Sequence, residues 1–243
     1  MQQHVQAIFL DAGNTLFVER RPRTEMYAEV AREFGSEATA EHVERSFSMR
    51  MKELPASIDG AYRFSTDWFR AFHDLLFQDL GVPGGRTGDA HERMVEVFED
   101  PANFQVFEEV PEVLADLADR DLILGVVSNW SERLPRLLQA LGIAEPFDFI
   151  VTSAELRAEK PDRSIFERAL FRAGRRASET LHAGDHFERD VRGALNAGLR
   201  AALVERNGDP ARKRSSEREG VPVLRDLRPL LALAAPASHA SSS

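Results

Sequence analysis

The segment VQAIFLDAGNTLF, residues 5–17, decides the fold that this sequence predicts. Residues 5–10 form a short apolar run that is typical of a buried strand, and the run ends on Asp11. The turn that follows contains Gly13 and Asn14. Open α/β sheets bind ligands outside the carboxyl ends of their strands, so a carboxylate at this place indicates a candidate functional site.

Further apolar runs of strand length follow along the chain and alternate with helical patterns. The runs cover residues 122–127, 147–151, 180–183, 201–204 and, more weakly, 221–224. The helical patterns cover residues 111–119, 131–141, 162–174 and 188–197. Strands that alternate with helices of this length predict βαβ units, and therefore an α/β fold with a doubly wound parallel sheet.

One region interrupts this alternation. Between residues 18 and 98 there is no convincing strand, and the amphipathic helical stretches are Thr24–Phe34, Glu41–Leu54, Ser65–Leu80 and Asp89–Phe98. We therefore predict a Rossmann-like core, an inserted all-helical cap and a disordered tail. The core would comprise residues 1–17 and 99–233, the cap residues 18–98, and the tail residues 234–243.

Composition excludes several classes of function. The 243-residue chain has a formal net charge of −9, so no basic field attracts nucleic acid or anionic lipid. It has no cysteine, which excludes disulfides, thiolate zinc sites and cysteine nucleophiles. No apolar stretch approaches the roughly 20 residues that cross a bilayer, and the start lacks the parts of a signal peptide. We expect a cytoplasmic protein without nucleic-acid or membrane partners, and a solvated loop at the basic run 212–214.

Polar residues follow the predicted strands in an order that suits phosphate chemistry. Asp11 can attack phosphorus as a strand-end carboxylate, or it can simply form a turn with its own backbone. Ser128 and Asn129 can bind the oxygens of a phosphate, or they can help to cap the next helix. Lys160, which Pro161 holds before a helix N-terminus, can neutralise both a nucleophile and a transferred anion.

The segment GDHFERD, residues 184–190, has the most chemical content. Asp185 and Asp190 lie five residues apart across a turn, where both can reach one hard cation such as Mg²⁺. The alternative for Asp185 is a helix N-cap. His182 is predicted to be a packed strand residue, whereas His186 is expected to face the mouth of the site.

Together, four segments resemble the motifs of the haloacid dehalogenase-like (HAD) hydrolase superfamily. These segments are DAGNTLF at 11–17, SN at 128–129, KPD at 160–162 and GDHFERD at 184–190. The helical insert is similar to the cap of subfamily IA, and residues 11–35 are similar to a branch named after a rhythmically expressed insect gene. The resemblance covers nearly the whole chain and implies a sheet of order 3-2-1-4-5, with the Asp11 strand in its centre.

The resemblance also implies roles for individual residues. Asp11 would be the catalytic nucleophile, and Lys160 would be catalytic because it neutralises Asp11. The residues that would bind the phosphoryl group of a small phosphorylated substrate are Ser128, Asn129 and Lys160. The residues that would hold Mg²⁺ are Asp11, Gly13 through its carbonyl, Asp185 and Asp190, the last as a ligand or as support.

Gly13 departs from the pattern of the family's phosphatases, which have an aspartate there that protonates the leaving group and later activates water. General acid–base catalysis of this kind contributes about 10²- to 10⁴-fold, and glycine has no side chain to supply it. Phosphoryl transfer from an activated substrate can survive this loss. Hydrolysis of an ordinary alkyl phosphate should be slow unless His186 or the substrate itself supplies the proton.

The predicted function is a HAD-like hydrolase, in the simplest case a Mg²⁺-dependent phosphatase. Dehalogenases of the family also lack the second aspartate, but they have an aromatic residue at the Gly13 position and no acidic fourth motif. Phosphonate hydrolysis would require a cap lysine such as Lys52, which is better explained as a surface residue. A catalytically impaired protein that only binds a phosphate ligand is the third alternative. Arg20, Arg21 and Arg23 can meet an anionic substrate or lie at the surface.

Overall fold

The computed structural model describes residues 4–234 and divides the chain into two compact units. The first unit takes in the chain up to residue 18, residues 106–129 and the chain from residue 141 onward. The second comprises residues 19–105 and 130–140. The second unit therefore includes residues 99–105 and 130–140 in addition to the predicted insert.

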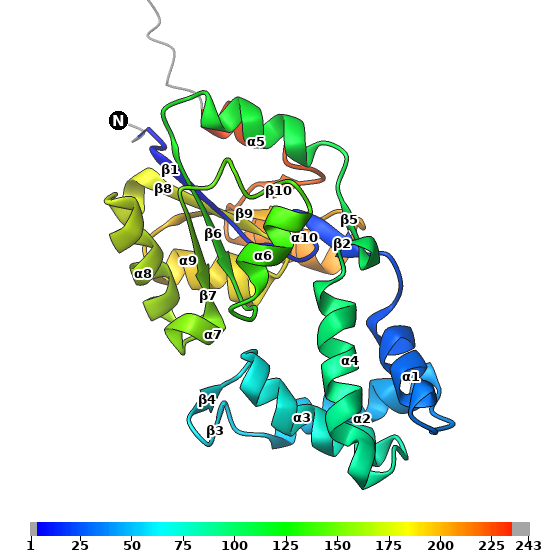
Figure 1. The fold of residues 1–243 in the computed structure, drawn as a ribbon. Helices are drawn as coiled ribbons and strands as arrows, with labels where there is room; N and C mark the ends of the chain where they lie inside the picture. The colour runs from blue at the N-terminus through cyan, green and yellow to red at the C-terminus, as the bar shows by residue number, and fades with distance from the viewer. Residues whose placement is uncertain (1–3, 235–243) are drawn as a thin grey trace, which may run out of the picture. The chain divides into compact units, whose positions relative to one another are not determined.

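A six-stranded parallel sheet flanked by helices forms the centre of the first unit (Figure 1). Its order is β10-β9-β8-β1-β6-β7. The strands are β1 (Ala7–Leu10), β6 (Ile123–Ser128), β7 (Phe149–Thr152), β8 (Thr180–Gly184), β9 (Arg200–Val204) and β10 (Val223–Leu224). The predicted α/β class and the order around a central β1 are confirmed, with β10 added as a sixth strand at one edge.

The central strands are held by close packing on a buried face. All four residues of β1 are buried, which explains its unbroken apolar run. Phe9 meets the ring of Phe149 edge to face at 5.5 Å between centroids. The Phe149 ring also covers Gly125, where a Cβ atom would lie 2.3 Å from the ring. Only glycine therefore fits at this point of β6.

Both edges of the sheet, as far as it is described, are short. β10 has two residues and β7 has four. The guanidinium Nη1 of Arg172 donates a hydrogen bond of 3.1 Å to the carbonyl of Ile150 in β7. A side chain from a neighbouring helix thus binds one of the carbonyl groups of this edge strand.

The helices of the first unit connect these strands. They are α5 (Val110–Ala118), α7 (Ser153–Leu156), α8 (Arg163–Ala173), η3 (Ala177–Glu179), η4 (Phe187–Arg192), α9 (Gly193–Asn196), α10 (Pro210–Arg218) and α11 (Leu230–Leu233). Asp162 caps α8 as predicted, since its Oδ1 accepts a 2.8 Å hydrogen bond from the Ser164 N–H. Gly174 ends the same helix with a φ of 60°, the left-handed conformation that glycine adopts readily.

Two predictions for this unit need correction. The helix predicted at residues 188–197 is a π-helical segment, η4, followed by the short helix α9. The basic run 212–214, predicted as a loop, belongs to α10, because Asp209 caps a helix that has Pro210 in its first turn. The predicted disordered tail, residues 234–243, lies outside the described residues apart from Ala234, which follows α11.

The second unit is mainly helical. Its helices are α1 (Arg23–Glu33), α2 (Ala40–Glu53), α3 (Thr66–Asp79), η1 (Gly84–Arg86), α4 (Thr87–Glu99), η2 (Pro101–Asn103) and α6 (Leu134–Ala140). The four long helices agree with the predicted stretches to within about two residues. Thr39 and Ser65 cap α2 and α3, and the rings of Trp68 and Phe72 stack at 5.5 Å in the core.

Short strands that the sequence did not predict lie outside the six-stranded sheet. β3 (Ser57–Ile58) and β4 (Ala61–Tyr62) form a two-residue antiparallel pair. β2 (Phe17–Glu19) and β5 (Phe104–Val106) form a separate two-stranded sheet. Residues 130–140 join the second unit through polar contacts: Arg133 Nε donates to Thr66 Oγ1 at 2.8 Å, and Glu132 Oε1 accepts from the Thr66 N–H at 3.2 Å.

A buried polar chain crosses the core of the second unit. Tyr27 OH lies 2.8 Å from His73 Nε2, and His73 Nδ1 lies 2.8 Å from His91 Nδ1. All three side chains are buried. Burial lowers the pKa of His73 well below its ordinary value, and the adjacent His91 lowers it further. Burial also lowers the pKa of His91, so both rings are neutral in the folded unit at neutral pH.

We expect the second unit to lose stability as the pH falls below about 6.5, the ordinary histidine pKa. The unfolded chain binds protons there while the buried rings remain neutral, so acid favours unfolding. The slope is about 1.4 kcal/mol per pH unit for each histidine that stays neutral. Urea unfolding between pH 7.5 and pH 5.5, followed by tryptophan fluorescence, measures it, since Trp68 and Trp130 both belong to this unit.

Replacing both buried rings, as His73→Leu with His91→Leu, should flatten this dependence. Replacing the exposed His42 by Asn is the matched control and should leave the slope as in the native chain. An equal slope in the double variant and the native protein would contradict the assignment.

Candidate active site

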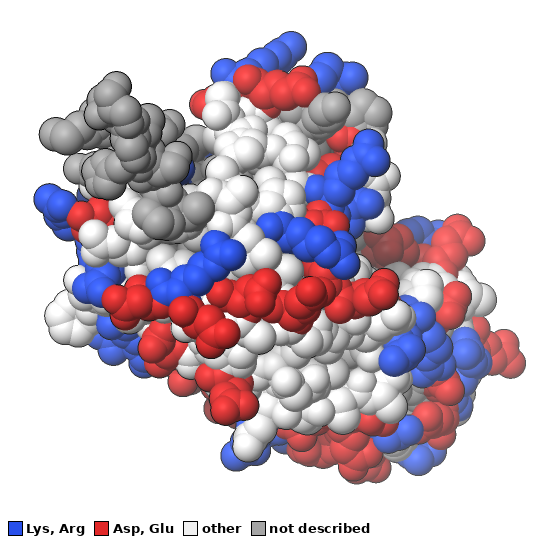
Figure 2. All heavy atoms as spheres, turned by 90° about the horizontal axis from the view of Figure 1, so that it is seen from above, with Lys and Arg blue, Asp and Glu red and all other residues white. Residues whose placement is uncertain are grey.

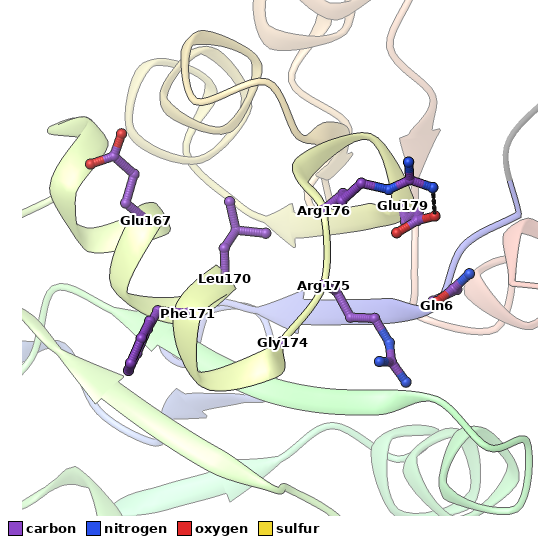
Figure 3. Close-up of a pocket in the computed structure, with 8 residues that line it drawn as sticks. All are labelled: Gln6, Glu167, Leu170, Phe171, Gly174, Arg175, Arg176 and Glu179. Atoms are coloured by element: carbon purple, nitrogen blue, oxygen red, sulfur yellow. Dashed lines mark hydrogen bonds and ion pairs between the residues drawn. The ribbon is translucent and has the colours of Figure 1, made fainter.

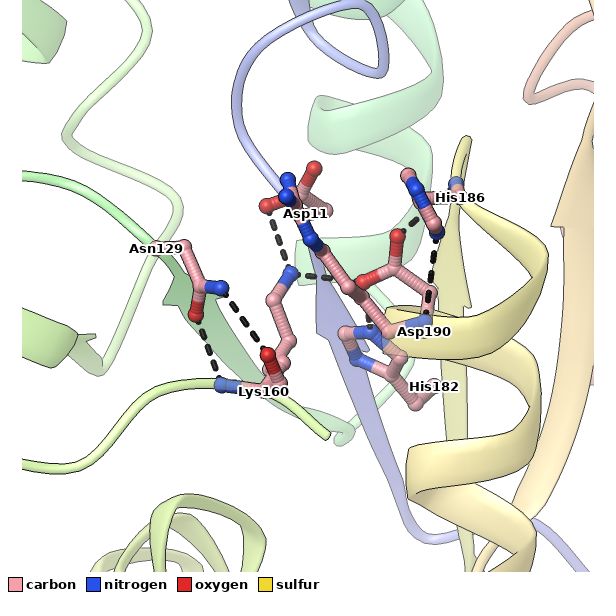
Figure 4. A network of polar contacts seen from close by, with 7 residues as sticks. Asp11, Asn129, Lys160, His182, His186 and Asp190 are labelled. Carbon is pink, nitrogen blue, oxygen red and sulfur yellow. Dashed lines mark hydrogen bonds and ion pairs between the residues drawn. The ribbon is translucent and has the colours of Figure 1, made fainter. Parts of the chain in front are cut away.

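The candidate residues meet at the carboxyl edge of three adjacent strands. Asp11 follows β1, Ser128 ends β6, and Asp185 follows β8. The backbone N–H of Asp11 donates a 3.0 Å hydrogen bond to the Ala183 carbonyl, which joins the end of β1 to β8. The parallel sheet thus brings together residues that lie more than a hundred positions apart in the sequence (Figure 4).

A buried ion network forms the centre of the site. Lys160 Nζ lies 2.7 Å from Asp11 Oδ1 and 2.6 Å from Asp190 Oδ1 (Figure 4). Lys160 is 2% exposed, Asp190 1% and Asp11 8%. Charges buried to this extent are stable only when they are paired, so the ammonium and the two carboxylates depend on one another.

The protonation states of this network follow from its charges. Burial alone would lower the pKa of Lys160, but the negative charges of Asp11 and Asp190 outweigh burial and raise that pKa above its ordinary value. Burial alone would raise the pKa of Asp190. The charge of Lys160 and the hydrogen bond from His182 outweigh it and hold the pKa of this carboxyl well below its usual range. Lys160 is therefore a cation and Asp190 an anion at neutral pH.

Asn129 fixes the backbone of Lys160. Its Oδ1 accepts a 2.7 Å hydrogen bond from the Lys160 N–H, and its Nδ2 donates a 3.0 Å hydrogen bond to the Lys160 carbonyl. The amide thus holds the lysine loop against the end of β6. This positioning contact was not predicted, and direct binding of phosphate by Asn129 and by the buried Ser128 remains a prediction.

Three carboxylates gather beside the lysine. Asp11, Asp185 and Asp190 each offer an oxygen, and these oxygens lie within 4.8 Å of one another. Oxygen ligands of this kind suit Mg²⁺, which commonly binds one or two carboxylates and keeps several waters. The donor set therefore fits the predicted metal. Gly13 lies in the turn directly after Asp11, where the next N–H, that of Asn14, donates to the Phe17 carbonyl at 2.7 Å.

Asp190 is the most constrained of the three carboxylates. Its Oδ1 accepts from Lys160 Nζ and lies 2.9 Å from His182 Nε2, while its Oδ2 accepts a 2.9 Å hydrogen bond from the His186 N–H. It also packs on Gly184, where a Cβ atom would lie 2.3 Å from Asp190 Cγ. The glycine of the GDHFERD segment is therefore needed to admit this carboxylate.

His182 is the residue whose role the sequence did not reveal. It was predicted to be a packed strand residue, and it is fully buried, but its ring also contacts Asp190. A histidine in an apolar strand shows no local signal of such a partner. His186 caps η4, since its side chain accepts a hydrogen bond of 3.3 Å from the Arg189 N–H.

The more distant candidates fit the surface interpretation. Arg21 pairs with Glu29, and Arg23 pairs with Glu19. Lys52 is exposed on α2. Figure 2 shows acidic and basic side chains close together on one face of the molecule, which is consequently not a continuous basic surface.

A separate hollow lies on the surface of the first unit (Figure 3). Its lining includes Leu170, Phe171, Gly174 and Arg175, and the Phe171 side chain is 77% exposed. None of the four motif segments contributes to the described lining. The ion network and the carboxylates, rather than this hollow, are therefore the candidate active site.

Comparisons with known proteins agree with this architecture. A sequence model for the family described as haloacid dehalogenase-like hydrolase matches residues 11–204. The haloacid dehalogenase-like hydrolase domain-containing protein 3 of Bos taurus is 32% identical over 229 residues, 91% of this chain and 91% of that protein. A phosphoserine phosphatase of Thermus thermophilus is 32% identical over 145 residues, 59% of this chain and 58% of that protein.

Solved structures show the same fold. A HAD phosphatase from Thermococcus onnurineus superposes with a TM-score of 0.68 over 94% of this chain and 97% of that one, at 24% sequence identity. None of the described helices is both long enough and apolar enough to cross a membrane.

We expect Gly184→Ala to displace the Asp190 carboxylate, because the new methyl group would lie 2.3 Å from its Cγ atom. Overpacking of this kind lowers the free energy of unfolding by about 1–3 kcal/mol, which urea unfolding measures. Gly88→Ala is the matched control, since a Cβ atom there meets nothing within 4 Å. Equal stabilities of the two variants would contradict the role assigned to Gly184.

Proposed function

The chain belongs to the haloacid dehalogenase-like hydrolase family, and from this premise we propose that it is a Mg²⁺-dependent phosphatase of a small phosphorylated metabolite. Family membership makes it a hydrolase, and its relatives include phosphatases. The observation that supports this chemistry best is the Asp11 carboxylate, which is paired with a buried ammonium beside two further carboxylates.

The residues that would hold the metal are Asp11 and Asp185, with the Gly13 carbonyl as a further ligand and Asp190 as a ligand or as support. When bound, Mg²⁺ would neutralise charge on the phosphoryl oxygens and orient them. The oxygen donors of the described carboxylates suit it.

The first chemical step would use Asp11 as a nucleophile. A carboxylate oxygen of Asp11 forms a bond to phosphorus, and the bond from phosphorus to the leaving oxygen breaks, so that the leaving group departs with the electron pair. The ammonium of Lys160, 2.7 Å from Asp11, would attract the phosphoryl oxygens. Water then attacks the aspartyl-phosphate, and the carboxylate and inorganic phosphate are released.

Gly13 determines which leaving groups this site handles well. A phenolate leaves without a proton, but an alkoxide needs one, and glycine cannot supply it. His186 remains a candidate donor, because it lies next to Asp185 and is only partly buried. The proposed enzyme is therefore atypical or weakened in its acid–base catalysis.

The alternative chemistries gain less support. Carbon–halogen hydrolysis does not account for a cluster of three carboxylates. A Schiff base at Lys52 would require an exposed lysine of α2 to act as a nucleophile. A protein that only binds a phosphate ligand would keep the same ion pairs between Lys160 and the two carboxylates. Measured turnover of a phosphate ester would distinguish a phosphatase from such a protein.

Replacing the nucleophile tests the proposal directly. Asp11→Asn should abolish turnover of p-nitrophenyl phosphate, a loss of at least about 10³-fold, because the amide cannot attack phosphorus. A chelator should abolish native turnover, and added Mg²⁺ should restore it. Asp116→Asn, at an exposed position of α5, is the matched control and should turn over like the native protein. Turnover that persists in Asp11→Asn would refute the mechanism.

Introducing an aspartate at position 13 tests whether the missing general acid limits turnover. Gly13→Asp should raise kcat for an alkyl phosphate by about 10²- to 10⁴-fold and change kcat for p-nitrophenyl phosphate much less. Gly13→Asn is the control, because an amide has similar size but cannot serve as the acid. Equal effects of the two substitutions would show that the proton comes from elsewhere.

A further inference from the structure

We infer that His182 is a positioning residue of the active site, which holds the Asp190 carboxylate and thereby fixes the Lys160 ammonium against Asp11. This inference rests on the proposed function in so far as it concerns turnover. Its structural part concerns only the described side chains and stands without it.

The backbone of His182 is fixed by the sheet. It lies in the middle of β8, paired in register with Phe9 of β1 on one side and with Ala201 of β9 on the other. Its side chain is fully buried. The backbone of a residue in a central strand, which is hydrogen-bonded to strands on both sides, has little freedom to move.

The orientation of the ring is fixed by packing. Phe166 of α8 meets the His182 ring nearly at right angles, with 5.2 Å between centroids and 81° between planes. Gly193 leaves room for Phe166, since a Cβ atom there would lie 2.9 Å from Phe166 Cε2. The ring of His182 is thus held by a side chain whose helix begins directly after the Lys160–Pro161 segment.

The His182 ring contacts the same Asp190 oxygen that binds Lys160. His182 Nε2 lies 2.9 Å from Asp190 Oδ1, and the same oxygen accepts from Lys160 Nζ at 2.6 Å. Because an ionised carboxylate only accepts, Nε2 carries the proton and donates it to this bond. Together with the His186 N–H on Oδ2, the ring fixes both the position and the rotation of the carboxylate.

Packing alone does not explain a histidine here. The other ring nitrogen, Nδ1, is buried and has no hydrogen-bond partner among the described residues. An apolar side chain would fill the same space without burying such an atom. The hydrogen bond from Nε2 to Asp190 compensates for the cost of burying Nδ1 without a partner.

The expected consequence is a slower chemical step. Without the Nε2 donor, Asp190 Oδ1 keeps only the hydrogen bond from Lys160, and the position of Lys160 Nζ 2.7 Å from Asp11 becomes less fixed. Residues that orient the groups of a site through hydrogen bonds typically contribute 10- to 100-fold to activity. We expect kcat for p-nitrophenyl phosphate to fall by about this factor in His182→Leu, with KM changed less than about threefold.

Two amides of different length separate positioning from packing. The Nε2 atom of glutamine stands two bonds beyond Cγ, as in histidine, whereas the nitrogen of asparagine stands one bond beyond Cγ and falls short. His182→Gln should therefore recover most of kcat, and His182→Asn should not. Thr180→Val is the matched control, a buried polar-to-apolar change in the same strand whose hydroxyl donates to the Arg176 carbonyl instead. It should leave kcat unchanged.

A crystal structure of His182→Leu provides a readout that does not depend on turnover. We expect Lys160 Nζ to move beyond hydrogen-bond distance of Asp11 or of Asp190. An unmoved lysine, native kcat in His182→Leu, or equal kcat in His182→Gln and His182→Asn would each overturn the inference. If the leucine variant does not fold, the comparison of the two amides still decides. If the native protein turns over no phosphate ester, the proposed function fails, and the crystal structure alone decides the role of His182.

Discussion

The buried Lys160 ammonium is the interaction on which the active site depends. It joins the end of β1, through Asp11, to the segment after β8, through Asp190, at distances of 2.7 and 2.6 Å. Each partner would be unstable in the interior without the others, because an unpaired buried charge is strongly unfavourable. The same network that organises the carboxyl edge of the sheet thus holds the proposed nucleophile in place.

Two glycines near the site are explained by side chains that pack closely against their backbone. Gly184 lets the Asp190 carboxylate lie against β8, and Gly193 lets Phe166 reach the His182 ring. The π-helical turn η4, Phe187–Arg192, carries Asp190 toward that ring. Irregular turns of this kind are common at functional sites, since they place a side chain where a regular helix would not. The glycines and the irregular turn therefore determine where Asp190 lies, although the glycines themselves have no side chain in the site.

Much of this fold follows from the sequence because strands and helices leave local patterns. Apolar runs located the five principal strands, and the four motif segments placed Asp11 and Lys160 at one site. The π-helical turn and the contact of His182 with Asp190 could not be predicted, because they depend on packing between residues that carry no shared local pattern. The prediction that Asn129 binds phosphate stays a prediction, and its hydrogen bonds to the Lys160 backbone depend on a loop conformation that no short segment determines.

The two short edges of the sheet limit the pairing of strands from other chains. An exposed edge strand is a template on which a foreign strand can pair and begin aggregation. β10 offers only two residues for such pairing, and the guanidinium of Arg172 occupies the Ile150 carbonyl on β7. A parallel sheet with short and partly covered edges can keep an apolar interior while offering few backbone groups on which a strand of another chain could pair.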